Sequence, residues 1–273
     1  MKHLLLAHDL CGVGKVSLST MLPVFERLGC TTSYLPTAIV SNTLDYGQAE
    51  IVDASDYMEK SLAIYENLGF QFDAICTGFL LSEKQVEILQ DYLKLHPQMK
   101  IYIDPIMGDE GELYPGVGEA TVLAMKRIIK GADLILPNYT EACTLADRKI
   151  EKVANLKQIE GLCETLAESA KAILITSVFN EEDGKHYVVG YEQGKMFALP
   201  FDYIDVRLPG TGDIFSALVV GEIEKGCDLK VAAQKAIHVV HDLIDLNKEN
   251  EDKYFGIFVE RDLKKVLPCQ DQE

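Results

Sequence analysis

The chain has 273 residues, 48% of them hydrophobic, so it is long enough to bury a full core as one α/β domain. Its 43 acidic and 26 basic residues give a formal net charge of −17, which argues against a nucleic-acid partner or an anionic membrane, since both favour clustered Lys and Arg. The charge does not exclude a phosphate ligand, because helix N-termini and backbone N–H groups can hold phosphates.

Targeting signals and disulfides are not expected. No stretch approaches the about 20 apolar residues that span a bilayer, and the apolar run in MKHLLLAHDL is too short for a signal peptide. The seven cysteines are dispersed without a CxxC pair, which is typical of reduced thiols in the cytoplasm. They are Cys11, Cys30, Cys76, Cys143, Cys163, Cys227 and Cys269.

Two kinds of apolar pattern alternate along the chain. Short β-branched runs predict strands at residues 3–7, 33–40, 74–77, 100–104, 134–136 and 172–176. Longer amphipathic runs predict helices near residues 16–28, 54–68, 83–95, 117–129 and 156–169. A hairpin over 187–191 and 196–199 and two helices, 214–225 and 229–246, follow. The alternation predicts a doubly wound, mostly parallel sheet with helices on both faces, and residues 1–273 form one domain with no repeat or linker.

Polar or glycine-rich segments follow most of the predicted strands. In doubly wound sheets, ligands bind outside the carboxyl ends of the strands, so these segments predict one site along one edge. They are His8-Asp9, Ser41-Asn42-Thr43, Thr77-Gly78-Phe79, Asp104-Pro105, Pro137-Asn138 and Thr176-Ser177.

The first glycine-rich stretch, Gly12-Val13-Gly14-Lys15, fits neither familiar nucleotide motif. A P-loop needs a glycine at the position of Asp9 and a Ser or Thr at the position of Val16. A dinucleotide fingerprint needs a glycine at the position of Ser17. The stretch is either a flexible turn between strand and helix or a segment that covers a substrate.

The strongest local signal is Pro209-Gly210-Thr211-Gly212-Asp213, directly before an apolar-periodic run. Glycines ahead of a helix let the backbone approach a ligand and leave the first N–H groups free to hold a phosphoryl group in transfer. Asp213 could accept the proton of an attacking hydroxyl, or it could merely cap the helix.

Two further segments contain carboxylates at strand ends. Asp104 in DPIMGD (residues 104–109) suits magnesium, or simply begins a turn before proline. In PNYTEA (residues 137–142), Asn138 and Glu141 could form a capping box or belong to a metal site. The six histidines include no HExxH and no zinc spacing, and no G-x-S-x-G indicates a serine hydrolase.

Six segments in this order resemble the ribokinase-like superfamily, and within it the vitamin B6 (pyridoxal/pyridoxamine) kinases. They are TAIVSNTLDYG (37–47), TGFL (77–80), DPIMGD, PNYTEA, ITS (175–177) and PGTGD (209–213). The resemblance covers most of the chain. It implies a three-layer α/β/α sandwich with small lid elements, usually a homodimer, that transfers the γ-phosphoryl group of ATP to the 5′-hydroxymethyl group of pyridoxal, pyridoxamine or pyridoxine.

The resemblance also implies a role for each matching residue. Asp213 would be the catalytic base, and the backbone of Gly210, Thr211 and Gly212 would form the anion hole. Asp104 and Glu141 would lie at Mg²⁺ and the ATP phosphates, and Asn138, Thr176 and Ser177 would lie along ATP. The vitamer would be surrounded by Asp9, Val16, Thr43, Leu44 and Phe79. Asp109 and Tyr114 would belong to a loop near the phosphates. A monovalent cation such as K⁺ is a further expected cofactor, and Arg207 is either an added positive charge over the phosphates or an exposed loop residue.

Three positions depart from the better-known B6 kinases, which have serine, histidine and tyrosine where Asp9, Thr43 and Phe79 stand. Asp9 instead resembles the first loop of the hydroxymethylpyrimidine kinases of thiamine synthesis. The alternatives are therefore a hydroxymethylpyrimidine (phosphate) kinase with the same chemistry, or a vitamin- or nucleotide-binding protein without catalysis.

Overall fold

The structure is a computed structural model that describes residues 2–153 and 155–268. In the described part of the chain, one sheet has the strand order β11-β10-β9-β8-β5-β4-β1-β2-β3. Its strands are β1 (His3–Val13), β2 (Thr31–Asn42), β3 (Ile51–Asp53), β4 (Ala74–Thr77), β5 (Lys100–Ile103), β8 (Leu134–Ile135), β9 (Ala172–Asn180), β10 (Lys185–Glu192) and β11 (Lys195–Phe201). The strands from β2 to β9 in this order are parallel, whereas β3, β10 and β11 join the sheet in antiparallel pairs.

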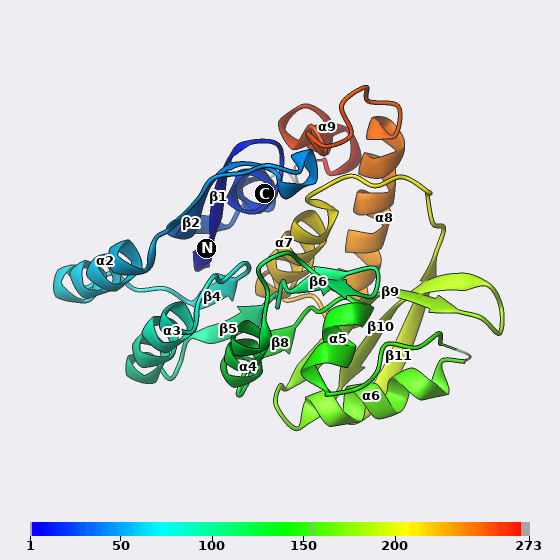
Figure 1. The fold of residues 1–273 in the computed structure, drawn as a ribbon, viewed down its shortest axis with the longest axis horizontal. Coiled ribbons are helices and arrows are strands. Elements are labelled where there is room, and N and C mark those ends of the chain that lie inside the picture. The colour runs from blue at the N-terminus through cyan, green and yellow to red at the C-terminus, as the bar shows by residue number, and fades with distance from the viewer. Residues whose placement is uncertain (1, 154, 269–273) are drawn as a thin grey trace.

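Helices connect the strands and cover the sheet. They are α1 (Leu18–Arg27), α2 (Ser55–Leu68), α3 (Glu83–Leu95), α4 (Glu119–Ile128), α5 (Tyr139–Leu145), α6 (Lys157–Ala167), α7 (Thr211–Glu224), α8 (Leu229–Asn247) and α9 (Val259–Val266), with the 3-10 turn η1 (Leu44–Tyr46). Figure 1 shows β1 and β2 at one end of the sheet, the β10–β11 hairpin at the other, and α7 in the middle of the molecule.

The sheet is buried on both faces. Leu5 and Ile75 belong to a core cluster with α2 to α6, whereas their neighbours Leu4 and Cys76 belong to a second cluster with α1, α7, α8 and α9. Successive side chains of a strand alternate between faces, so each buried strand feeds both clusters. Each fully buried Leu or Ile stabilises the fold by about 2 kcal/mol. The predicted three-layer sandwich with a mostly parallel sheet is confirmed.

The predicted hairpin is confirmed, with a tight turn between β10 and β11. Its two central residues, Gln193 and Gly194, both have positive φ, 52° and 75°. Positive φ at both central positions is the type I′ geometry, whose twist matches that of antiparallel strands.

Other elements differ from the sequence prediction. β1 extends to Val13 rather than Ala7, with a shift of register between His8 and Leu10, so His8 and Asp9 lie inside the strand and not after it. β3, α9, and the small hairpin of β6 (Gly108–Asp109) and β7 (Glu112–Leu113) were not predicted. The three strands have only two or three residues each, which is too few to show a period. Within residues 2–153 and 155–268, no helix is long and apolar enough to cross a bilayer.

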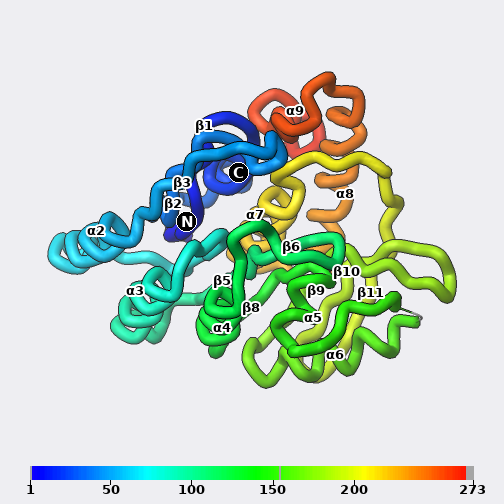
Figure 2. The backbone as a smooth tube through the Cα atoms, in the orientation of Figure 1, coloured from blue at the N-terminus to red at the C-terminus, as the bar shows by residue number. Residues whose placement is uncertain are grey.

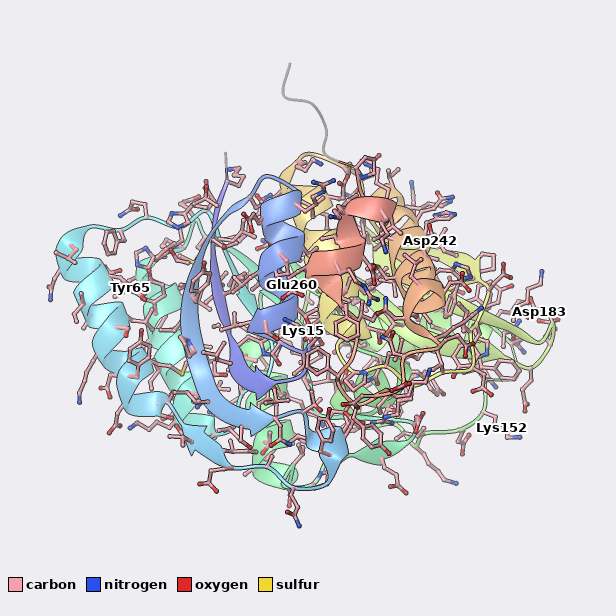
Figure 3. All side chains as sticks on the ribbon, turned by 90° about the horizontal axis from the view of Figure 1, so that it is seen from above. Lys15, Tyr65, Lys152, Asp183, Asp242 and Glu260 are labelled. Atoms are coloured by element: carbon pink, nitrogen blue, oxygen red, sulfur yellow. The ribbon has the colours of Figure 1, made fainter. Side chains whose placement is uncertain are left out.

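The end of β1 lies against the C-terminal part of the chain, as Figure 2 shows for β1 and the region of α9. The N–H of Lys15 donates to the carbonyl of Phe255 at 2.7 Å, and its side chain pairs with Glu260, which lies beside it in Figure 3. Gly12, Gly14 and Lys15 are absent from the described lining of the main cavity. These contacts argue against a segment that covers a substrate, although of the stretch only Gly14 and Lys15 lie between β1 and α1, because Gly12 and Val13 end β1.

Candidate active site

A cavity of about 1440 Å³ lies at the carboxyl ends of the parallel strands. Loops that follow parallel strands meet at this edge, which is where doubly wound sheets bind ligands. The cavity is lined by all the residues that the sequence analysis proposes for a site: Asp9, Val16, Thr43, Leu44, Phe79, Asp104, Asp109, Tyr114, Asn138, Glu141, Thr176, Ser177, Gly210, Thr211, Gly212 and Asp213.

The glycine-rich segment before α7 brings a carboxylate to the start of a buried helix. α7 begins at Thr211, with Gly210 as its N-cap at a φ of 83°. A Cβ atom on Gly210 would lie 2.1 Å from the Lys15 carbonyl oxygen, so both the conformation and the close approach require glycine. The first turn of a helix leaves N–H groups without helical partners, and an anion can accept from them.

Asp213 is the third residue of α7 and is only 8% exposed. Its Oδ2 accepts the backbone N–H of Ser17 at 2.7 Å, and its Oδ1 lies 3.1 Å from His8 Nε2. Both partners belong to the first segment of the chain rather than to α7. Gly210, not Asp213, occupies the N-cap position, so the capping interpretation of Asp213 does not describe its contacts.

His8 lies between two carboxylates. Its Nδ1 is 2.9 Å from Asp9 Oδ1, which also accepts the Ser17 hydroxyl at 2.6 Å. Burial disfavours the charged imidazole, but hydrogen bonds to Asp213 and Asp9 outweigh it and raise the pKa of His8 from 6.5 to about 10. Ser17 was not predicted as a site residue, and His8 was expected at the site only as part of the polar segment His8-Asp9, with no role assigned to it. The available signal was the polar pair His8-Asp9 inside an apolar strand.

Asp104 follows β5 and faces the same cavity. Its Oδ2 accepts the Ser216 hydroxyl from α7 at 2.7 Å. Asp104 is partly accessible from the cavity, although protein atoms surround its carboxylate. This burial raises the pKa of Asp104 from 3.8 to about 7, with a smaller opposing effect of the Ser216 hydrogen bond and a further rise from the charge of Asp213.

Glu141 and Asn138 form the capping box of α5. Asn138 Oδ1 accepts the Glu141 N–H at 3.0 Å, and Glu141 Oε2 accepts the Asn138 N–H at 2.9 Å. The capping interpretation is therefore confirmed, yet Glu141 also faces the cavity and its Oε1 accepts the Met107 N–H at 2.9 Å. Burial, followed by the charge of Asp104, raises the pKa of Glu141 well above its usual 4.5.

A divalent cation fits the pair of Asp104 and Glu141. Two shielded carboxylates that repel each other are both stabilised by a cation, which relieves the burial of their charge. Among the described residues, no group of three or more His, Cys, Asp or Glu gathers to enclose a metal ion. Mg²⁺ can bind through one or two protein carboxylates, since it keeps several waters.

The polar residues Thr176 and Ser177 lie within β9 rather than after it. Thr176 forms an isolated parallel bridge with Asn138, which joins the middle of β9 to the start of α5. Ser177 has a φ of 59°, which is uncommon for a residue other than glycine. This kink occurs beside a shift in the pairing of β9 with β10, and both residues line the cavity there.

The opposite end of the cavity is formed by Val16, Thr43, Leu44 and Phe79. Thr43 is buried, and its hydroxyl donates to the Tyr254 carbonyl at 2.9 Å, so this group fixes the loop instead of pointing freely into the cavity. Leu44 opens η1 and is 43% exposed. Apolar side chains thus form most of this end, which also contains the carboxylates of Asp9 and Asp45.

Arg207 links two loops at the rim of the cavity. Its guanidinium pairs with Asp45 at 2.9 Å and with Glu110 at 3.4 Å, and about half of its side chain is exposed. Burial raises the pKa of nearby Asp109 and of Tyr114. The two loops held by Arg207 border the site from the end of β2 and from the β6–β7 hairpin.

Comparison with known proteins decides the family. The family described as phosphomethylpyrimidine kinase matches residues 19–257. The chain belongs to the phosphomethylpyrimidine kinase family. A Bacteroides thetaiotaomicron protein, provisionally named a phosphomethylpyrimidine kinase, has a crystal structure that is 31% identical, with a TM-score of 0.93 over 99% of this chain and 96% of that one. A second crystal form of that protein contains pyridoxal.

Other relatives of this chain carry a pyridoxal kinase name. The crystal structure of pyridoxal kinase from Lactobacillus plantarum is 26% identical, with a TM-score of 0.88 over 98% of this chain and 97% of that one. Pyridoxal kinase PdxY of Burkholderia lata is 28% identical over 89% of this chain and 88% of its own. The match to the provisionally named pyridoxal kinase of Schizosaccharomyces pombe is 29% identical over 71% of this chain but spans 59% of that protein. The predicted resemblance to ribokinase-like B6 kinases is confirmed.

Proposed function

We propose that this protein is an ATP- and Mg²⁺-dependent kinase that phosphorylates the 5′-hydroxymethyl group of pyridoxal, pyridoxamine or pyridoxine. The observation that carries the proposal is the carboxylate of Asp213, which two protein donors hold in the first turn of α7, beside the N–H groups that follow Gly210. The pyridoxal kinase names of the Lactobacillus plantarum and Burkholderia lata relatives support it, as does the pyridoxal bound by the Bacteroides thetaiotaomicron relative.

The chemistry is an in-line transfer of the γ-phosphoryl group. Asp213 accepts the proton of the substrate hydroxyl while that oxygen forms its bond to the γ-phosphorus. The bond from the γ-phosphorus to the bridging oxygen breaks, and ADP leaves with that electron pair. The N–H groups of Gly210, Thr211 and Gly212 hold the oxygens of the group in transfer, where negative charge develops. The proton on Asp213 then returns to solvent.

The nucleotide occupies the end of the cavity lined by Asn138, Thr176 and Ser177. Asp104 and Glu141 hold Mg²⁺, which neutralises phosphate charge when it is bound. Asp109 and Tyr114 border the phosphates from the loop that contains the β6–β7 hairpin. A monovalent cation such as K⁺ belongs to the same proposal.

The acceptor occupies the mainly apolar end, and Asp9 is its polar contact. Phe79 offers a stacking surface, and Val16, Thr43 and Leu44 enclose the ring. Asp9 lines the cavity, so its carboxylate can bind a ring nitrogen or amino group that enters there.

A hydroxymethylpyrimidine (phosphate) kinase is the second candidate. The same Asp9 favours it, because a carboxylate can bind a pyrimidine amino group as readily as a pyridine substituent. The description of the matching family and the provisional name of the Bacteroides thetaiotaomicron relative point the same way.

Several properties of the whole protein form part of the proposal. Residues 1–273 act as one ribokinase-like kinase domain in the cytoplasm, as a homodimer without a nucleic-acid or membrane partner. The formal net charge of −17 supports the last two points, since both surfaces repel an acidic protein.

The experiment that tests the base is Asp213→Asn. The variant removes a proton acceptor at nearly constant volume, so ATP binding by calorimetry stays within about threefold of wild type while kcat falls by about 10²–10⁴-fold. Asp91→Asn, which changes an aspartate with 76% side-chain exposure on α3, is the matched control and keeps wild-type kcat. Turnover by Asp213→Asn close to wild type would exclude Asp213 as the base. ATP binding without ADP release by the wild-type protein would indicate a binding protein.

A further inference from the structure

Both carboxylate oxygens of Asp213 have a donor from the first segment of the chain. His8 Nε2 lies 3.1 Å from Oδ1, and the Ser17 N–H donates to Oδ2 at 2.7 Å. Two donors on two oxygens fix the plane of a carboxylate, and with it the direction of the lone pairs that remain. We propose that His8 is a positioning residue that orients the base Asp213 and connects it to Asp9 at the acceptor end. The inference rests on the proposed role of Asp213.

The proton on His8 Nε2 follows from its partner. An ionised carboxylate is an acceptor only, so Nε2 must be the donor toward Asp213 Oδ1. Nδ1 lies 2.9 Å from the Asp9 carboxylate and 2.9 Å from the Asp9 backbone N–H. In a charged imidazole, Nδ1 donates to the Asp9 carboxylate, whereas in a neutral one Nδ1 accepts the Asp9 backbone N–H. The contact with Asp213 is the same in both states, so His8 holds Asp213 whichever state is present.

The imidazole has little freedom to leave this position. His8 is 2% exposed, and a Cβ atom added to Gly78 would lie 2.0 Å from its ring. The ring thus packs on the bare backbone of the loop after β4, in space that a side chain at Gly78 would fill. A fixed ring is what a positioning role requires, because an orienting hydrogen bond works only if its donor is itself held.

Ser17 is a second bridge between the same two carboxylates. Its N–H donates to Asp213, and its hydroxyl donates to Asp9 Oδ1 at 2.6 Å. Ser17 has a φ of 55°, a conformation that costs a residue other than glycine on the order of 1 kcal/mol. The surrounding contacts hold this strain, and strained backbone of this kind clusters at functional sites. Asp9 is therefore connected to Asp213 on two sides, and a ring bound at Asp9 is linked to the base through His8 and Ser17.

The test compares three substitutions. His8→Leu removes the donor at similar volume, and His8→Gln keeps an N–H donor of similar reach. His3→Leu is the matched control, since His3 lies on the same strand, bonds the Ser33 hydroxyl at 2.9 Å and is absent from the described cavity lining. Misorientation of a catalytic group costs up to about 10²-fold in rate, so His8→Leu should lower kcat about 30-fold. KM for ATP and for the acceptor should stay within about threefold, since His8 contacts neither ligand in the proposed mechanism.

The conservative variant separates positioning from folding. His8→Gln should recover kcat to within about fivefold of wild type, and His3→Leu should match wild type. Wild-type kcat in His8→Leu would overturn the proposal. Equal losses in His8→Leu and His8→Gln, in variants that still bind ADP, would overturn it too, because the donor would then not be the feature that matters.

A measurement without turnover keeps this inference distinct from the proposed function. Nitrogen-15 NMR of the histidine rings should show a proton on His8 Nε2, with a signal that moves in Asp213→Asn while the His3 signals stay. A wild-type protein that phosphorylates no acceptor but gives this result would refute the proposed function and keep the contact. An unprotonated His8 Nε2, or signals unaffected by Asp213→Asn, would refute the contact on which the positioning role depends.

Discussion

Replacing Gly210 with alanine tests the close approach between the start of α7 and the end of the first loop. The new Cβ atom would lie 2.1 Å from the Lys15 carbonyl oxygen, whereas ordinary contact begins at 3.4 Å. The two segments must therefore move apart by about 1 Å, because packed backbone atoms cannot accept the overlap. Ser17 lies two residues after Lys15 on that loop, and its N–H donates to the Asp213 carboxylate.

The expected cost has two parts. A φ of 83° strains an alanine by about 1 kcal/mol, and overpacking adds about 2 kcal/mol, so Gly210→Ala should lower the free energy of unfolding by about 3 kcal/mol. Gly194→Ala is the matched control for strain alone. Gly194 has a φ of 75° with no atom within 4 Å of the added Cβ, so its cost should be about 1 kcal/mol.

Urea unfolding of the ligand-free proteins measures both costs, and turnover measures the effect on the site. kcat/KM of Gly210→Ala should fall about 100-fold, since displacement of the loop moves a donor of Asp213. Gly194→Ala should keep wild-type turnover, because it lies in the β10–β11 turn outside the described cavity lining. If Gly210→Ala is as stable as Gly194→Ala and as active as wild type, the close packing at Gly210 has no part in the site.

Three other substitutions give separate predictions. Gly78→Ala displaces the His8 ring and should lower kcat about tenfold with KM for both substrates within about threefold, by steady-state kinetics. Asn138→Ala removes the capping box of α5 and should lower the free energy of unfolding by about 1 kcal/mol in urea titrations. Burial opposes ionisation of Asp262, but hydrogen bonds, first that of Arg261, outweigh it and lower its pKa from 3.8 to about 2. This depressed pKa stabilises the fold above about pH 4 and the gain is lost as the pH falls toward 2, so the stability difference between wild type and Asp262→Asn should shrink over that range.

The sequence predicted elements best where a single period dominates. The predicted helix at 83–95 and the predicted strand at 74–77 have the same bounds in α3 and β4. The end of β1 was missed because Asp9 and Gly12 interrupt its apolar pattern, and β-propensity disfavours both residues. The two-residue strand β6 depends on its pairing with β7 and, unlike β8, is not part of a buried apolar run that the sequence could reveal.

The candidate site, like the fold, was predicted only in part. Local motifs at strand ends were enough to select residues that the fold gathers around one cavity. The contact of His8 with Asp213 joins residues 205 positions apart, and the bridge through Ser17 uses a backbone N–H, so neither leaves a spacing that a single sequence can reveal. The capping box at Asn138 and Glu141 shows a different limit, because the same two side chains fit a structural role and a ligand-binding role.

The most direct test of the central claim is ADP release by the wild-type protein with ATP and Mg²⁺. Pyridoxal, pyridoxamine, pyridoxine and hydroxymethylpyrimidine are compared as acceptors by kcat/KM. We expect the fastest turnover on a pyridine vitamer, with the phosphoryl group on the 5′-hydroxymethyl oxygen. Preference for the pyrimidine would keep Asp213 as the base but contradict the proposed substrate. Absence of ADP release with all four acceptors would contradict the proposed kinase activity.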